Sequence, residues 1–221
     1  MSHKQAGKLI IENIQMLEEA IRLLGVDLSQ EIFDVIDNLV KEKIDTFTED
    51  WDGTYALFEE GIDFAPVTWK AVSTGQYKFE DYFAQYELTY NSIGVDSNSA
   101  EYWLTCFFSN TFEEMVFKFK PNRENFTKCI KASWKNFAVS QNEKYPEIES
   151  LGFKYSAKEG EWYLPIDSLN QQWVADCYVE DNLADAMSPI TEALDKLYQA
   201  HPYFDKIVEA AKAQFGVNVQ D

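Results

Sequence analysis

The sequence predicts an α+β fold, in which helices at both ends of the chain surround a central antiparallel sheet of about five strands. Near both termini, apolar residues recur every three or four positions, as they do on one face of an amphipathic helix. Through the middle of the chain they alternate with polar residues instead, which is typical of half-buried strands. The connections between these middle segments are short, and short connections favour antiparallel neighbours.

The first 52 residues are expected to form an antiparallel helical hairpin. A first helix is predicted over residues 3–24, with Gly25 placed to end it, and a second helix follows from Asp27 to about residue 51. One face of the first helix is an apolar stripe made of Ile10, Ile14, Leu17, Ile21 and Leu24. We expect this stripe to pack on the rest of the chain, and pairing with a second copy is the alternative.

The sheet is expected from residues 64–120 and 151–167. Alternation predicts strands over residues 82–90, 102–108 and 114–120, followed by a hairpin that joins "LGFKYS" to "EWYLPI". An amphipathic helix over residues 123–140 is predicted between the two groups of strands. Its apolar face consists of Phe126, Ile130, Trp134 and Phe137.

The C-terminal helices are predicted over residues 182–215. Ser188 and Pro189 are typical of a helix start, and His201-Pro202 is expected to interrupt the helix, with His201 as a polar turn residue. Because the chain has no internal repeat and no linker composition, residues 1–221 are expected to form a single domain.

The sequence lacks the motifs that are typical of several classes of enzyme and cofactor-binding protein. It contains no dinucleotide fingerprint, no phosphate-binding P-loop and no G-x-S-x-G nucleophile motif. It has two histidines, and its three cysteines, Cys106, Cys129 and Cys177, form no C-x-x-C pair. No acidic residue has a lysine two positions later, so a nuclease-like relative of the (D/E)-x-K type is expected to be inactive. We therefore expect no metal or cofactor, and we assign no catalytic residue.

The chain carries 38 acidic and 19 basic residues, a formal net charge of −19. Such a chain repels nucleic acid and anionic membranes and attracts basic proteins. The acids are also segregated, because residues 44–69, 79–117 and 159–195 contain no Lys or Arg. On a rigid scaffold, such carboxylates are able to imitate the phosphate spacing of a nucleic acid.

The first acidic segment provides the predicted partner-binding residues. These are Glu49, Asp50, Trp51, Asp52, Glu59, Glu60 and Asp63. We interpret the segment itself as a helix end that packs its aromatic residues inward, because those residues recur at helical spacing, and its acids on the outer face are the candidate interface. They are Phe47, Trp51, Tyr55 and Phe58.

A basic patch is predicted within residues 118–158, which hold nine of the 19 basic residues. It consists of Lys118, Lys120, Arg123, Lys128, Lys131 and Lys135. Three interpretations are open: a solvated helix face, a contact with an anion or nucleic acid, or docking on the acidic surface of a second copy.

The leading hypothesis is a cytoplasmic, non-enzymatic protein that binds a basic protein partner as an inhibitor, immunity-type or adaptor protein. The cytoplasmic location is expected because the sequence lacks a secretory signal and a disulfide framework. No membrane span is expected. The alternative function is an Asp/Glu-dependent hydrolase or a nuclease-like protein. A homo-oligomer joined from basic patch to acidic face, such as a homodimer, is the third hypothesis.

Overall fold

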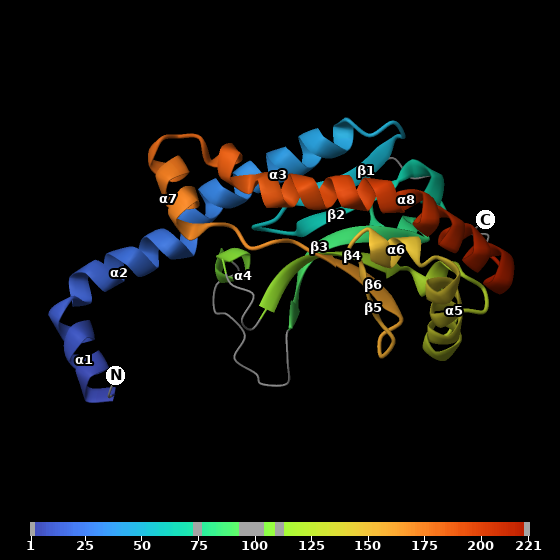
Figure 1. Cartoon of the computed structure of the whole chain (residues 1–221), viewed down its shortest axis with the longest axis horizontal. Helices are drawn as coiled ribbons and strands as arrows, with labels where there is room; N and C mark the ends of the chain where they lie inside the picture. The colour runs from blue at the N-terminus through green and yellow to red at the C-terminus, as the bar shows by residue number, and fades with distance from the viewer. Residues whose placement is uncertain (1–2, 73–76, 93–103, 109–112, 219–221) are drawn as a thin grey trace.

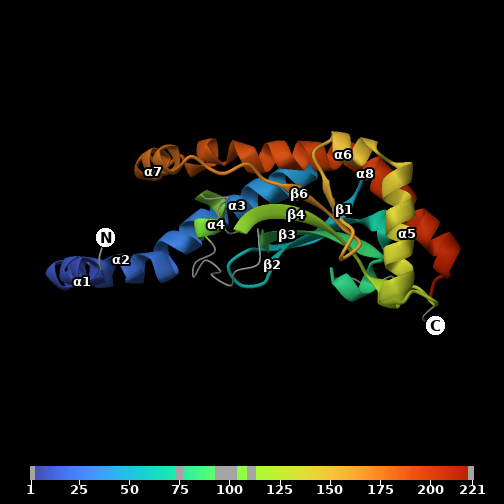
Figure 2. The same ribbon diagram turned by 60° about the horizontal axis from the view of Figure 1, so that its bottom comes forward.

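A computed structural model describes residues 3–72, 77–92, 104–108 and 113–218. A six-stranded antiparallel sheet lies beneath a layer of helices, and a helical segment at the N-terminus projects from one end of the molecule (Figures 1 and 2). The predicted α+β class is confirmed. Among the described residues, no helix combines the length and the apolar character needed to cross a membrane.

The sheet has the strand order β1-β2-β3-β4-β6-β5. Its strands are β1 Trp51–Ala56, β2 Gly61–Pro66, β3 Ala84–Ser92, β4 Glu113–Pro121, β5 Lys154–Ser156 and β6 Glu161–Pro165. The longest ladder joins β3 to β4, from Ala84 opposite Pro121 to Ser92 opposite Glu113. The structure thus confirms the strands expected near residues 82–90 and 114–120 and the hairpin within residues 151–167.

The hairpin of β1 and β2 replaces the helix end that was expected to reach residue 51 and beyond, so that expectation is wrong. The helix α3 (Leu28–Asp45) ends earlier, and the chain pairs Trp51 with Pro66 and Ala56 with Gly61. Gly61 adopts a φ of +100° at the turn, a conformation that favours glycine. The helical spacing of the aromatic residues is a coincidence, because pairing with β3 decides the local structure here.

The N-terminal helices do not form the predicted hairpin. The helices α1 (His3–Glu12) and α2 (Ile14–Arg22) are followed by a π-helical turn (Leu23–Asp27) that joins α2 to α3. Gly25 lies inside this turn and is not among the glycines with positive φ, so it does not adopt the conformation that ends a helix. We call residues 3–22 the arm. Of the predicted apolar stripe, Leu24 packs against the core. Neither α1 nor α2 contains a buried residue, so the expected packing is wrong for the rest of the stripe.

Two further segments differ from expectation. Of the strand predicted over residues 102–108, the described part forms the short helix α4 (Leu104–Phe108), and residues 102 and 103 lie outside the described residues. The helix predicted over residues 123–140 is α5 (Lys131–Lys144), preceded by a 3₁₀ turn at Arg123–Asn125. Its start is delayed because Phe126 pairs with Val217, and the next two backbone N–H groups donate to the carbonyls of Gly216 and Phe215.

The C-terminal region contains α6 (Glu147–Ser150), the unpredicted helix α7 (Gln171–Val179), a 3₁₀ turn (Leu183–Met187) and α8 (Ser188–Phe215). Pro189 lies in the first turn of α8, as predicted. The expected break at His201-Pro202 is absent, because α8 continues through Pro202 and bends in its C-terminal half (Figure 1). Proline removes one helical hydrogen bond, but the residues on both sides of it are held by burial against the sheet.

The core lies between the sheet and the helices α3 and α8. Phe204 of α8 stacks on Phe119 of β4 with a centroid separation of 4.7 Å and meets Tyr86 of β3 edge-on at 5.7 Å. On α3, Ile36 and Val40 are fully buried. The opposite face of the sheet, which we call the outer sheet face, is turned away from α3 and α8.

Gly53 of β1 is expected to be intolerant of a larger residue. A Cβ atom added there would lie 2.7 Å from the backbone oxygen of Asp63 and 2.9 Å from Cβ of Phe64. Gly53→Ala should therefore lower the free energy of unfolding by about 1–3 kcal/mol, measured by urea denaturation. Gly7→Ala is the control, because a Cβ atom at Gly7 meets nothing within 4 Å. Equal stabilities of the two variants would contradict this packing.

Candidate protein-binding surface

The predicted partner-binding residues do not form one continuous surface. Glu49 and Asp50 precede β1, whereas Glu59 and Glu60 lie in the turn that follows it. A strand of this length separates its two ends by roughly 20 Å. Trp51 packs inward, with its ring 5.5 Å from that of Phe47 and 4.8 Å from that of His201.

Asp52 lies in a local polar network. Its carboxylate accepts hydrogen bonds from the Tyr82 hydroxyl and from Lys70 Nζ, the latter at 3.0 Å. These two groups, with the Tyr82 hydrogen bond as the larger cause, lower the pKa of Asp52 despite its partial burial. Asp52 is thereby tied to groups of its own chain.

The outer sheet face brings predicted acidic and basic residues into a single row. The strand register places Asp63 opposite Glu87, Glu87 opposite Lys118, and Lys118 opposite Tyr163. Alternation of side chains then directs all four away from the aromatic core. The row mixes both signs of charge, so it is neither the acidic surface nor the basic patch that the sequence predicted as separate features.

Hydrogen bonds and ion pairs link this row to its neighbours. Lys120 Nζ lies 2.7 Å from Glu87 Oε2, and Lys118 Nζ lies 3.5 Å from Glu161 Oε2. Gln85 donates to Asp63 Oδ1 at 3.0 Å and accepts from the Tyr77 hydroxyl at 2.6 Å. Lys118 and Lys120 are thus neutralised by acids of the same sheet.

The remaining basic residues are also dispersed. Lys131 Nζ pairs with Glu159 at 3.2 Å, and Lys135 Nζ donates to the backbone oxygen of Lys158. Lys128 precedes α5, so it does not share a helix face with Lys131 and Lys135 as predicted. Arg123 and Lys128 instead line a cleft of about 660 Å³ at the start of α5.

Asp63 provides a test of the electrostatics of the outer sheet face. Burial, reinforced by Glu87 and opposed by Lys120, raises the pKa of its carboxyl to about 6. The unfolded chain loses this proton near pH 4, so the folded state binds more protons between about pH 4 and 6 and its stability falls as the pH rises through that range.

Asp63→Asn, which keeps an oxygen acceptor for Gln85, should remove this dependence. At pH 8 the variant should be more stable than the wild type by roughly 1–2 kcal/mol, a value discounted for solvent screening. The difference should shrink towards zero at pH 4, as measured by urea denaturation across this range. Glu60→Gln, in the exposed β1–β2 turn, controls for loss of charge alone. If the stabilities of Asp63→Asn and the wild type differed by the same amount at every pH, the raised pKa of Asp63 would be refuted.

The outer side of the helical layer is strongly acidic. The helices α3 and α8 lie side by side, and Lys43 Nζ of α3 lies 2.7 Å from Asp195 Oδ1 of α8 (Figure 1). We call this side the acidic helical surface. Its exposed acids are Glu31, Asp34, Glu42, Asp45, Asp176, Glu180, Asp181, Asp185, Glu192 and Asp195. Two segments that are far apart in the sequence thus contribute acids to one side of the molecule.

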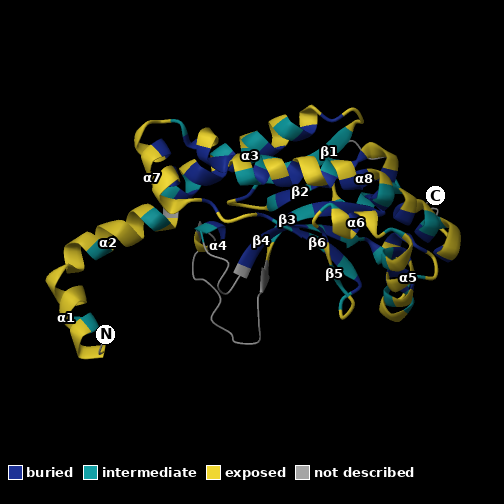
Figure 3. Cartoon of the chain, viewed as in Figure 1, coloured by how far each residue is buried: buried dark blue, intermediate teal, exposed yellow. Residues whose placement is uncertain are grey.

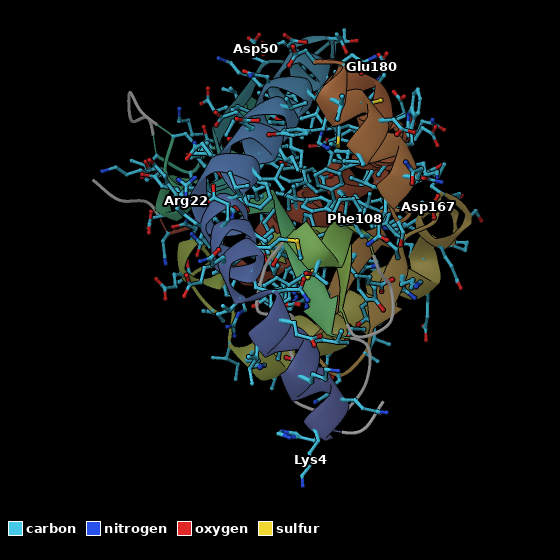
Figure 4. All side chains as sticks on the ribbon, turned by 90° about the vertical axis from the view of Figure 1, so that its left-hand side faces the viewer. Lys4, Arg22, Asp50, Phe108, Asp167 and Glu180 are labelled. Atoms are coloured by element: carbon cyan, nitrogen blue, oxygen red, sulfur yellow. The ribbon has the colours of Figure 1, made fainter. Side chains whose placement is uncertain are left out.

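A cleft of about 710 Å³ opens on the acidic helical surface between α3 and α7. We call it the α3–α7 cleft. It is lined by Glu31, Asp34, Val35, Tyr178, Val179, Asp181 and Leu183. Val179 is 81% exposed and Tyr178 is 38% exposed, so apolar surface is available beside three carboxylates. Viewed from the arm, α7 with Glu180 lies next to α3 (Figure 4). This combination suits a basic segment that also carries apolar side chains.

His201 is a buried residue that the sequence analysis wrongly placed in a turn. It is 2% exposed and lies within α8. Its Nδ1 is 3.2 Å from the Tyr86 hydroxyl and its Nε2 is 3.3 Å from Glu49 Oε2. The signal for its burial is the helical spacing from Leu197 through His201 to Phe204, which is visible only if α8 is continued through Pro202. Since Trp51 and Trp69 pack on the imidazole, a substrate would have to displace aromatic side chains to reach it.

The imidazole of His201 should titrate at an unusually low pH. Burial lowers its pKa, and Glu49 and Asp205 oppose this effect only in part. Because the pKa of His201 is lower in the folded chain than in the unfolded chain, the unfolded chain binds more protons as the pH falls below about 6.5. The stability that the neutral, buried imidazole provides is therefore complete above about pH 6.5 and is lost as the pH falls.

The measurement is an NMR titration of a His3→Gln variant, which retains His201 as its only histidine. The midpoint should lie below about 6.5. Adding Glu49→Gln should lower it further, because the charge that favours the imidazolium is removed. A midpoint above the ordinary histidine value would refute the assigned environment.

Among the described residues, no three His, Cys, Asp or Glu side chains gather in an arrangement that could hold a metal ion. Comparison with known protein families, with curated proteins and with solved structures finds no match to this chain.

Proposed function

We propose that this protein binds a basic protein partner on its acidic helical surface, with the α3–α7 cleft as the central contact. The observation that carries the proposal is the cleft itself, in which Glu31, Asp34 and Asp181 surround the exposed side chains of Tyr178 and Val179. Acids at the rim of an interface steer a basic partner and set its orientation, whereas buried apolar and aromatic anchors contribute most of the affinity.

The charge of the whole chain supports a protein partner over other macromolecules. A net charge of −19 repels nucleic acid and anionic membranes at long range and accelerates association with a basic protein. An inhibitor, immunity-type or adaptor protein of the cytoplasm fits this behaviour, and acids on rigid helices are able to imitate nucleic acid for a nucleic-acid-binding target. Glu49 and Asp50 lie between α3 and β1 in the chain.

A carboxylate-dependent hydrolase is the second candidate function. Asp63 and Glu87 are directly opposed on neighbouring strands, and the pKa of Asp63 is raised to about 6. A carboxyl group whose pKa lies close to neutral pH is suited to act as a general acid or base. Hydrolysis of a test substrate that is lost in Asp63→Asn, with no change in partner binding, would favour this candidate.

Charge reversal in the α3–α7 cleft tests the proposed function. The tagged protein is used to capture partners from its native cytosol at low and high salt, and captured proteins are identified by mass spectrometry. Asp34→Lys combined with Asp181→Lys should weaken binding of a basic partner by at least about tenfold at low salt. High salt should weaken the wild-type complex, because exposed charges are screened.

The control is Glu59→Lys combined with Glu60→Lys, which makes the same change of net charge in the β1–β2 turn. Binding should be nearly unchanged in this variant. If both double variants lose the partner equally, only net charge matters and the cleft is not the contact. If no basic protein is captured at low salt, the proposal fails.

A further inference from the structure

The first strand of the sheet, β1, has one side that no other strand of the described sheet covers. In the order β1-β2-β3-β4-β6-β5 it is an edge strand, and its only ladder is with β2. A strand at the edge of a sheet presents a row of backbone N–H and C=O groups that are able to pair with another strand. The direction of these groups and their exposure decide whether this edge is available.

The hydrogen bonds of the β1–β2 hairpin show which backbone groups face outward. The N–H of Val67 donates to the carbonyl of Asp50 at 2.9 Å, across the pair of Trp51 and Pro66. That pair is therefore of the non-hydrogen-bonded kind, and the two kinds of pair alternate along an antiparallel ladder. The N–H and C=O groups that face away from β2 are then those of Trp51, Gly53 and Tyr55. We call these groups the β1 edge, and none of them forms a hydrogen bond within the residues that the structure describes.

Water reaches β1 from its open side. All six residues of the strand are partly exposed, including those whose side chains face the helical layer (Figure 3). In β6, which has neighbours on both sides, partly exposed and buried residues alternate instead. The exposure of β1 is therefore that of an edge, because exposure of one face would leave every second residue buried.

The strand also lacks the features that protect most edge strands. Such strands are usually short, or they carry Lys, Pro or a bulge. At the opposite edge of the sheet, β5 has three residues and begins with Lys154. In contrast, β1 has six residues with the sequence WDGTYA, and its register with β2 is uninterrupted. The β1 edge is therefore open to a further strand.

We propose that the β1 edge binds an extended, basic segment of a second protein, which joins the sheet as an additional strand. Exposed acids lie at both ends of β1, with Glu49 and Asp50 before it and Glu59 and Glu60 after it. No Lys or Arg occurs from residue 44 to residue 69. A strand of this length spans roughly 20 Å, so the matching segment has about six extended residues with Lys or Arg near both ends. Backbone hydrogen bonds provide affinity in this mode of binding, and the charges at the two ends select a basic sequence.

Charge makes a basic segment a better match than a second copy of this chain. If two copies of β1 paired in antiparallel orientation, Glu59 and Glu60 of one copy would lie beside Glu49 and Asp50 of the other. Like charges that are placed opposite one another destabilise a strand pair. The β1 edge shares no residue with the α3–α7 cleft, so the segment that it binds is independent of the proposed function.

Amide hydrogen exchange of the free protein tests whether the edge is open. The amides of Gly53 and Tyr55 should exchange at least about tenfold faster than those of Asp52 and Thr54, because the register directs only the latter two towards β2. NMR measures these rates residue by residue. Equal protection of all four amides would mean that the edge is covered and would overturn the inference.

A synthetic peptide tests the occupant. The probe has about eight residues, with lysine at both ends and alternating valine and threonine between them, and both of its termini are capped. At low salt it should bind the full chain with a Kd below about 100 μM and should protect the amides of Gly53 and Tyr55 from exchange. The same peptide with glutamate in place of lysine should bind at least about tenfold more weakly. If the lysine peptide does not bind at about 1 mM, the inference fails.

Methylation of the peptide backbone separates strand addition from attraction by charge alone. A peptide that is N-methylated on alternate residues keeps one unmodified edge, so it should bind within about threefold of the unmethylated peptide. N-methylation of every internal residue leaves the charges unchanged but removes the donors on both edges, and it should weaken binding by at least about tenfold. Equal affinities of the two methylated peptides would overturn strand addition.

Two double variants distinguish the β1 edge from the α3–α7 cleft. Glu59→Lys combined with Glu60→Lys should weaken binding of the lysine peptide by at least about tenfold. Asp34→Lys combined with Asp181→Lys makes the same change of net charge and should alter the peptide affinity by less than about threefold. The opposite pattern is expected for the basic partner captured at the cleft. A peptide affinity that falls as far in the cleft variant as in the edge variant would overturn the assignment to the edge.

Discussion

The stacking of Phe204 on Phe119 anchors the helical layer to the sheet, and the position of each candidate surface depends on it. Phe204 also contacts Tyr86, Phe153 and Trp162, so one side chain of α8 joins several strands and the loop that follows α6. Each such aromatic pair contributes about 0.5–1.5 kcal/mol beyond the area that it buries. Because this contact places α8 along the sheet, α3 is held beside it, and the other face of the sheet is left to polar side chains.

The two layers of the fold differ in their balance of charge. On the outer sheet face, strands from different parts of the sequence alternate Asp63 and Glu87 with Lys118 and Lys120, so the charges there neutralise one another. On the helical layer, α3 and the segment from α7 into α8 contribute acids that are balanced by few bases. The excess negative charge therefore lies on the side that also carries an apolar cleft, which is why we propose this side as the contact for a basic protein.

The arm differs from the rest of the protein, which we call the body, in how far its apolar side chains are buried. The body buries its aromatic residues in one core, whereas the arm keeps an apolar stripe in water and is joined to the body through a π-helical turn. An isolated amphipathic helix of this length is only marginally stable, and most helical stability in proteins comes from packing of the apolar face. The exposed apolar side chains of α1 and α2 therefore add little to the stability of these helices within one chain.

The sequence by itself determined the α+β class, the strands β3 to β6 and the acidic character of the chain, because these follow from local periodicity and composition. It also contained the apolar stripe of Ile10, Ile14, Leu17, Ile21 and Leu24. Only the tertiary structure decided that residues 51–66 form a hairpin, that α8 continues through Pro202 and that Gly25 does not end a helix. It also decided which charges meet, since the α3–α7 cleft joins Asp34 to Asp181 and β3 joins Glu87 to Lys118. Such pairings depend on contacts between residues far apart in the chain, and the local spacing of residues does not predict these contacts.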